Sequence, residues 1–258
     1  MTILGYILAL AIGLSLGILG GGGSILTIPV LHHVMGYTMR TAVPMSLVVV
    51  GITSGVGAIG HWRQGFVQLR TAVIFGIPAV IGAVLGAELG PRVRDDIRLT
   101  VFAIVMFGAA FTMFRGTRVR QLTLHPDQPA SARSDNFHYP VAVTLIGAGV
   151  GVLTGFVGVG GGFLYVPVLT VLAGLPVRQA IGTSLVLIVL SCAAGIARYL
   201  GHPELRALDW SVVALFTGIA LIGVLAGSRL VPYFSQQKLR RGFAIFLLVL
   251  GFVVLFVR

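Results

Sequence analysis

The chain has 258 residues, of which 57% are hydrophobic and only 10% are charged, and its mean hydropathy is +1.01. Soluble domains carry about a quarter charged residues, so this composition excludes an ordinary water-soluble domain. A net charge of +11 would suggest nucleic acid binding in a soluble protein. Here the basic residues lie between apolar stretches, where lipid headgroups are their usual partners. We therefore expect a lipid bilayer as a partner and no nucleic acid.

Long uncharged stretches recur along the chain, and a hydrocarbon layer needs about 20 apolar residues per helical span. Together they predict an all-α, polytopic membrane protein. The eight apolar segments are residues 3–31, 43–59, 72–89, 99–114, 140–172, 180–200, 210–231 and 242–257.

The first segment is too long for one straight helix, because 29 residues would extend about 43 Å. It contains four consecutive glycines, Gly20 to Gly23, followed by Pro29. Each glycine costs a helix about 1 kcal/mol relative to alanine, and proline removes a backbone donor. The pattern predicts a broken helix, and the fifth segment repeats it with its own glycine tract before Pro167.

These two tracts belong to an internal repeat. A shift of 138 residues aligns Gly17 to Leu31 with Gly155 to Leu169, and eight of the fifteen positions are identical. The sequence predicts an N-terminal membrane repeat (1–114), a polar linker (115–139) and a C-terminal membrane repeat (140–258). If all eight segments span the membrane, the halves are parallel; if the first segment of each half turns back, they are inverted. The sequence leaves both arrangements open.

A broken helix inside a bilayer is a candidate binding site, because unwound backbone survives there only beside protein or water. The half-helix that follows the glycines presents free N–H groups and the positive end of its dipole, which favour an anion. Close helix packing is the alternative role of such glycines. The candidate anion-binding residues at the breaks are Gly20, Gly22, Gly23, Ser24, Gly158, Gly160, Gly161 and Gly162.

The repeated glycine tracts resemble those of the TauE/SafE sulfite exporter family. Two further features carry the resemblance: the pattern R-x-A-x-x-x-S-L at 40–47 and 178–185, and the segments His61-Trp62-Arg63-Gln64-Gly65 and Leu208-Asp209-Trp210. The resemblance covers both halves and implies movement of small sulfur-containing anions across the cytoplasmic membrane. One departure is Pro44-Met45, where the second half has Gly182-Thr183.

Several polar residues near the breaks are further candidates. Arg40 and Arg178 begin matching helices, where they either hold an oxyanion or extend to the lipid interface. The hydroxyl groups of Ser46, Thr183 and Ser184 either line a path or join helices by hydrogen bonds. The candidate gating or coupling residues are His61, Arg198, Pro29 and Pro167.

The apolar segments hold no paired carboxylates, HExxH, GxSxG or clustered histidines, so we expect no enzyme, no metal site and no cofactor. The predicted function is a multi-pass transporter in the inner (cytoplasmic) membrane. It exports sulfite or an organosulfonate such as sulfoacetate by alternating access. An anion channel, or a membrane-embedded scaffold or enzyme, is the alternative. The sequence does not determine the oligomeric state.

Overall fold

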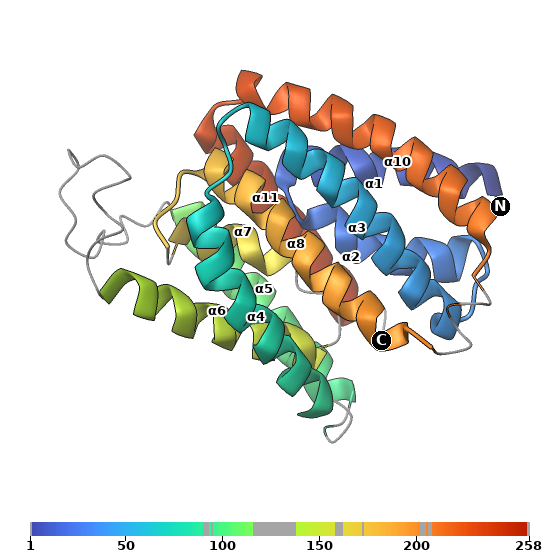
Figure 1. The fold of residues 1–258 in the computed structure, drawn as a ribbon, viewed down its shortest axis with the longest axis horizontal. Helices are drawn as coiled ribbons and strands as arrows, with labels where there is room; N and C mark the ends of the chain where they lie inside the picture. Colours follow the sequence, from blue (N-terminus) through green and yellow to red (C-terminus); the bar gives the residue numbers. More distant parts are fainter. Residues whose placement is uncertain are drawn as a thin grey trace.

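A computed structural model describes residues 2–89, 95–115, 138–157, 162–171, 173–201 and 208–256, together with Val93 and Leu205. The described part of the chain is helical and contains no strand, which confirms the all-α, polytopic prediction (Figure 1). The first half contains α1 (Thr2–Leu19), α2 (Gly22–Pro29), the π-helical turn η1 (Val30–Val34), α3 (Met39–Arg63), α4 (Leu69–Leu89) and α5 (Asp95–Arg115). The second half contains α6 (His138–Val157), α7 (Gly162–Val171), α8 (Val177–Tyr199), α10 (Trp210–Leu230), the 3-10 turn η4 (Val231–Tyr233) and α11 (Gln236–Phe256).

Four of the described helices are both long and apolar enough to cross a membrane, judged by length and composition. They are α3, α4 up to Gly86, α8, and α10 with its extension to Tyr233. Shorter apolar helices lie at 3–19, 100–114, 143–156 and 162–171. The lengths of the four long helices agree with a hydrocarbon layer about 30 Å thick.

The first apolar segment turns back on itself. Gly20 has a φ of +74°, a left-handed conformation that glycine adopts without steric cost, and α1 ends just before it. Beyond the break α2 returns along α1, so that Gly23 packs against Leu16 and Met35 reaches Gly5 near the start of α1. The two helices therefore form an antiparallel hairpin rather than one continuous span.

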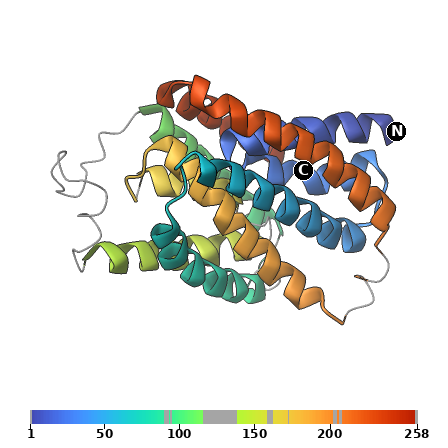
Figure 2. The ribbon, with the colours of Figure 1, turned by 45° about the horizontal axis from the view of Figure 1, so that its top comes forward.

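The two halves are inverted relative to each other. Helices α3 and α8 occupy equivalent places in the repeat, and their contacts pair Leu47 with Gly195, Gly51 with Cys192, and the segment near Gly57 with Leu185. Residue numbers rise along one helix as they fall along the other, so the pair is antiparallel (Figures 1 and 2). This observation decides between the two orientations that the sequence leaves open.

Equivalent contacts recur on both sides of this arrangement, as a pseudo-twofold axis requires. Gly86 of α4 packs closely against Val152 of α6, and the repeat counterparts Gly227 and Leu14 make the same contact between α10 and α1. In both cases the absent side chain lets the helix backbones approach closely, as small residues do in membrane helix pairs. The symmetry therefore holds at the level of individual contacts.

The bundle has two ends, each named here after a residue that lies at it. At the Arg178 end lie the α3–α4 turn (64–68), the start of α8 and the α10–α11 turn (231–235). At the Asp209 end lie the turn after η1 and the start of α10, where the Tyr37 hydroxyl donates to Asp209 over 3.1 Å. Helix α3 runs from the Asp209 end to the Arg178 end, and α8 runs back.

Candidate anion site at the glycine breaks

The N-terminal ends of the half-helices α2 and α7 meet in the interior of the bundle. The Cα of Gly21 lies so close to the Gly162 carbonyl that a methyl group would collide with it. A methyl on Gly162 would in turn lie 2.8 Å from the Ser24 hydroxyl. Ser24 and Gly162 are repeat counterparts, so this contact lies on the pseudo-twofold axis. Gly158, Gly160 and Gly161 fall outside the described residues.

Two of the carbonyl groups that the first break frees accept hydrogen bonds from side chains of other helices. The amide of Gly20 makes the last α-helical bond of α1, to Leu16, so the carbonyls that follow have no helical partner. His61 donates from Nε2 to the Gly17 oxygen over 3.2 Å, and Ser184 donates to the Gly20 oxygen over 2.7 Å. These donors come from α3 and α8, so both long central helices hold the break in place.

The backbone N–H groups at the start of α2, on the other side of the same break, have no side-chain cap. The helix α2 begins after Gly21 without a side-chain cap, and its first turn contains no acidic residue. Gly21, Gly22 and Gly23 are all buried. Since no side chain caps the start of α2, the positive end of its dipole is left without a compensating acceptor side chain. The break therefore presents the positive end of the α2 dipole to the interior of the bundle.

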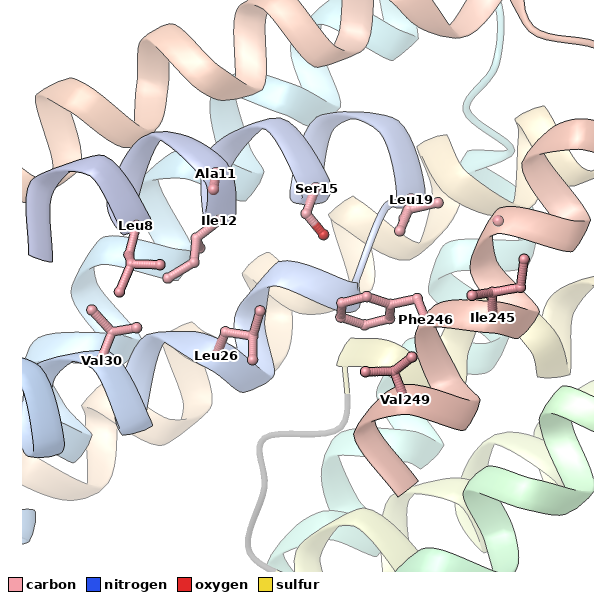
Figure 3. Close-up of a pocket in the computed structure, with 11 residues that line it drawn as sticks. Leu8, Ala11, Ile12, Ser15, Leu19, Leu26, Val30, Ile245, Phe246 and Val249 are labelled. Carbon is pink, nitrogen blue, oxygen red and sulfur yellow. The ribbon is translucent and has the colours of Figure 1, made fainter. Parts of the chain in front are cut away.

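The break is covered by protein on the side that faces α11. The ring of Phe246 lies against Gly22, where it separates the break from an open apolar cleft of about 540 Å³ (Figure 3). The cleft runs between α1, α2 and α11, and its lining is apolar except for Ser15, whose hydroxyl has no hydrogen-bond partner. The glycine tract is thus closed in this conformation.

The predicted hydroxyl residues lie in three different settings. Ser184 is at the break itself, as described above. Thr183, on the next position of α8, accepts a hydrogen bond from the Gln68 amide over 3.0 Å and so caps the start of α4. Ser46 is buried and donates to the Val43 carbonyl of its own helix. Of these three residues, only Ser184 therefore touches the described part of the breaks.

The predicted arginines lie at the ends of the bundle rather than at the break. Arg178 donates two hydrogen bonds from Nη2 to backbone carbonyls of the α10–α11 turn, those of Pro232 (3.0 Å) and Phe234 (2.8 Å). Arg40 is exposed at the start of α3, and Arg198 is exposed near the end of α8. None of these three arginines therefore contacts the described part of the break.

The prolines and His61 have distinct surroundings. Pro29 is the last residue of α2 and is followed by the π-helical turn η1, so the helix continues past Pro29 with a wider turn. The helix is interrupted at Gly20 and Gly21 instead. Pro167 is buried inside α7. His61 has no exposed surface, and its Nδ1 atom lacks a partner. Sequence reasoning missed Phe246 and Gln68, because neither stands out from its neighbours in composition or spacing.

Inverted halves, each with a broken helix in its first segment, are the common architecture of secondary transporters. The family model "Sulfite exporter TauE/SafE" matches residues 5–254, and the chain belongs to this family. A "Probable membrane transporter protein" of Xylella fastidiosa is 32% identical over 247 residues, covering 95% of this chain and 91% of the relative. The "Probable membrane transporter protein YdhB" of Bacillus subtilis is 24% identical, covering 95% of this chain and 96% of the relative.

No solved structure matches the chain. The family and the printed names of the relatives support membrane transport, and neither points to catalysis. The chain is thus a multi-pass membrane protein of a transporter family.

Proposed function

We propose that the protein exports small sulfur-containing anions, such as sulfite or an organosulfonate like sulfoacetate, by alternating access. The observation that carries this proposal is the meeting of α2 and α7 at the pseudo-twofold axis, where side chains cap two carbonyls of the first break and no side chain caps the start of α2. An oxyanion bound there replaces its water with backbone N–H groups. The family to which the chain belongs supports the choice of sulfur oxyanions.

The packing of the break favours a carrier over a channel. A channel needs a continuous wet path, whereas methyl groups at Gly20, Gly21 or Gly22 would each meet atoms of another segment at less than van der Waals distance. Such tight closure is typical of a site that opens to one side at a time. Helix rearrangement is then required for each transport cycle.

The charge distribution supports an orientation in the cytoplasmic membrane. Among the described residues, the Arg178 end carries eight basic residues (Arg63, Arg70, Arg115, Arg178, Arg229, Lys238, Arg240 and Arg241), and the Asp209 end carries three (Arg40, Arg98 and Arg198). The other seven basic residues fall outside the described residues. By the positive-inside rule, the Arg178 end faces the cytoplasm.

This orientation is tested by side-specific labelling of single cysteines in a Cys192→Ser background. Lys238→Cys, at the Arg178 end, should react with a membrane-impermeant maleimide in inside-out vesicles and not in intact cells. Thr38→Cys, at the Asp209 end, should show the opposite pattern. The reverse result for both positions would reject the orientation.

The driving force follows from the charge of the cargo. An inside-negative potential favours exit of an anion by roughly 2.3 kcal/mol per charge per 100 mV, so export proceeds without a coupling ion. Purified protein in proteoliposomes is tested with sulfite, thiosulfate, sulfate and small sulfonates under an imposed potential. We expect saturable sulfite or sulfonate flux that increases with the potential. Flux that ignores the potential and requires a pH gradient would reject this mechanism, and flux of none of these anions would reject the substrate class.

A further inference from the structure

Arg178 holds together three segments at the Arg178 end. Its guanidinium donates to the carbonyls of Pro232 and Phe234, which ties α8 to the α10–α11 turn. The same group lies 5.9 Å from the ring centroid of Phe66, on the α3–α4 turn of the other half. Arg178 thus connects the two halves at the end of the bundle that we assign to the cytoplasm.

Other hydrogen bonds close the same end. The side-chain amide of Gln68 donates to the side-chain oxygen of Gln179 over 3.3 Å, and the side-chain amide of Gln64 donates to the Ser228 carbonyl over 3.4 Å. The Val177 backbone amide donates to the Gln236 side chain over 2.9 Å. Every one of these bonds joins segments that are distant in sequence.

At the Asp209 end the Tyr37–Asp209 hydrogen bond joins the two halves, but the described residues show no counterpart of the Arg178 contacts there. Arg40 is the repeat counterpart of Arg178, since a shift of 138 residues aligns the two. Its side chain is exposed, and no hydrogen bond from it is found among the described residues. Two halves with identical contacts would close both ends equally. The two ends therefore differ in their arginine contacts, as one state of an alternating-access cycle requires.

An anion can replace the two carbonyl groups that accept hydrogen bonds from Arg178. Both of its acceptors are neutral carbonyls, and its Nε–H group is buried without a hydrogen-bond partner among the described residues. A sulfur oxyanion accepts from Nε and Nη together, in the two-pronged geometry that guanidinium prefers, and its charge makes each bond stronger. An anion arriving at this end therefore competes well against the two carbonyls.

We propose that Arg178 is a latch that holds the Arg178 end closed, and that an incoming oxyanion releases the latch by taking the guanidinium from Pro232 and Phe234. In the opposite state, Arg40 closes the Asp209 end in the same way. This inference rests on the proposed function, because it assigns the gate for the same anionic cargo. It makes Arg178 a gating and positioning residue rather than part of the central binding site.

The latch is tested by spin-label distances in a Cys192→Ser background. Labels at Arg63→Cys and Gln237→Cys report the Arg178 end, and labels at Thr38→Cys and Trp210→Cys report the Asp209 end. Arg178→Gln should shift the first pair to longer distances and the second pair to shorter ones. The ratio of long to short distances should change on the order of tenfold for each charge-assisted hydrogen bond lost. Sulfite should produce the same shift when Arg178 is present and no further shift in Arg178→Gln.

Arg229→Gln is the matched control, because Arg229 is an exposed arginine at the same end with no described hydrogen bond, and it should leave both distances unchanged. Arg178→Lys keeps the positive charge but not the planar guanidinium with its paired N–H donors, and it should give an intermediate shift. This variant replaces Arg178→Gln in the test if Arg178→Gln does not fold. Unchanged distances in the folded Arg178 variant, or equal changes in the Arg229 control, would overturn the latch. Sulfite flux through the parent protein in the same preparation shows whether the proposed function survives that result.

Discussion

Replacing Gly21 with alanine tests whether the meeting point of α2 and α7 is the anion site. Gly21 has a φ of −170°, an extended value that any residue adopts, so the substitution introduces no strain at φ. Its effect is steric, because the new methyl group would overlap the Gly162 carbonyl oxygen. A carbon–oxygen contact needs about 3.3 Å, so α2 and α7 must separate by on the order of 1 Å.

Two magnitudes follow from this separation. Overpacking of a well-packed interior costs about 1–3 kcal/mol of stability. A displacement of about 1 Å in a positioned site costs up to roughly 100-fold in function, so anion flux should fall much further than stability. We expect Gly21→Ala to remain folded with a sulfite flux 10- to 100-fold below that of the parent, as on the order of 1 Å of misplacement implies.

Flux is measured in proteoliposomes, and stability with a thiol-reactive dye. Cys192 is the single cysteine and is buried, so the dye reports unfolding at one position. Gly108→Ala is the matched control, since a methyl group there meets no atom within 4 Å and should leave flux unchanged. Parental flux and affinity in a folded Gly21→Ala protein would refute the placement of the site.

Substitutions at three further positions test two residues at the break, His61 and Ser184, and one at the Asp209 end, Tyr37. His61→Phe removes the donor to Gly17 and leaves a buried carbonyl unpaired, at about 1–3 kcal/mol of stability, whereas His61→Gln retains an N–H donor and should recover part of the loss in the dye assay. Ser184→Ala should cost a similar amount by freeing the Gly20 carbonyl, and Ser184→Thr, which keeps the hydroxyl, should cost less; equal losses would show that the hydroxyl is not what matters. Burial, and then the hydrogen bond to a carboxylate, raise the pKa of Tyr37, so its neutral form contributes stability below about pH 10 that is lost as the pH rises through the raised pKa. Tyr37→Phe should flatten the decline in melting temperature between pH 9 and 11, and an unchanged decline would show that Tyr37 does not cause it.

Much of the candidate site could be predicted from local pattern. Consecutive glycines are unfavourable in a helix regardless of what surrounds them, so the interruption of the first segment at Gly20 was readable from the sequence. Ser184 was also identifiable, because it occupies the repeated R-x-A-x-x-x-S-L pattern next to the breaks. The partners of these residues were not readable: nothing in the spacing of His61 indicates that it caps Gly17, which lies 44 residues away.

The sequence by itself determined that this is a helical membrane protein with duplicated halves and a helix broken at each glycine tract, because hydropathy, helix propensity and self-similarity are properties of the chain alone. Only the tertiary structure decided that the halves are inverted, that α2 and α7 meet end to end, and that Arg178 holds backbone carbonyls. The direction in which α2 leaves Gly20 depends on packing against Leu16, Ser184 and Phe246. Such contacts between distant segments leave no periodic trace in the sequence, and they fix how the two halves are oriented relative to each other.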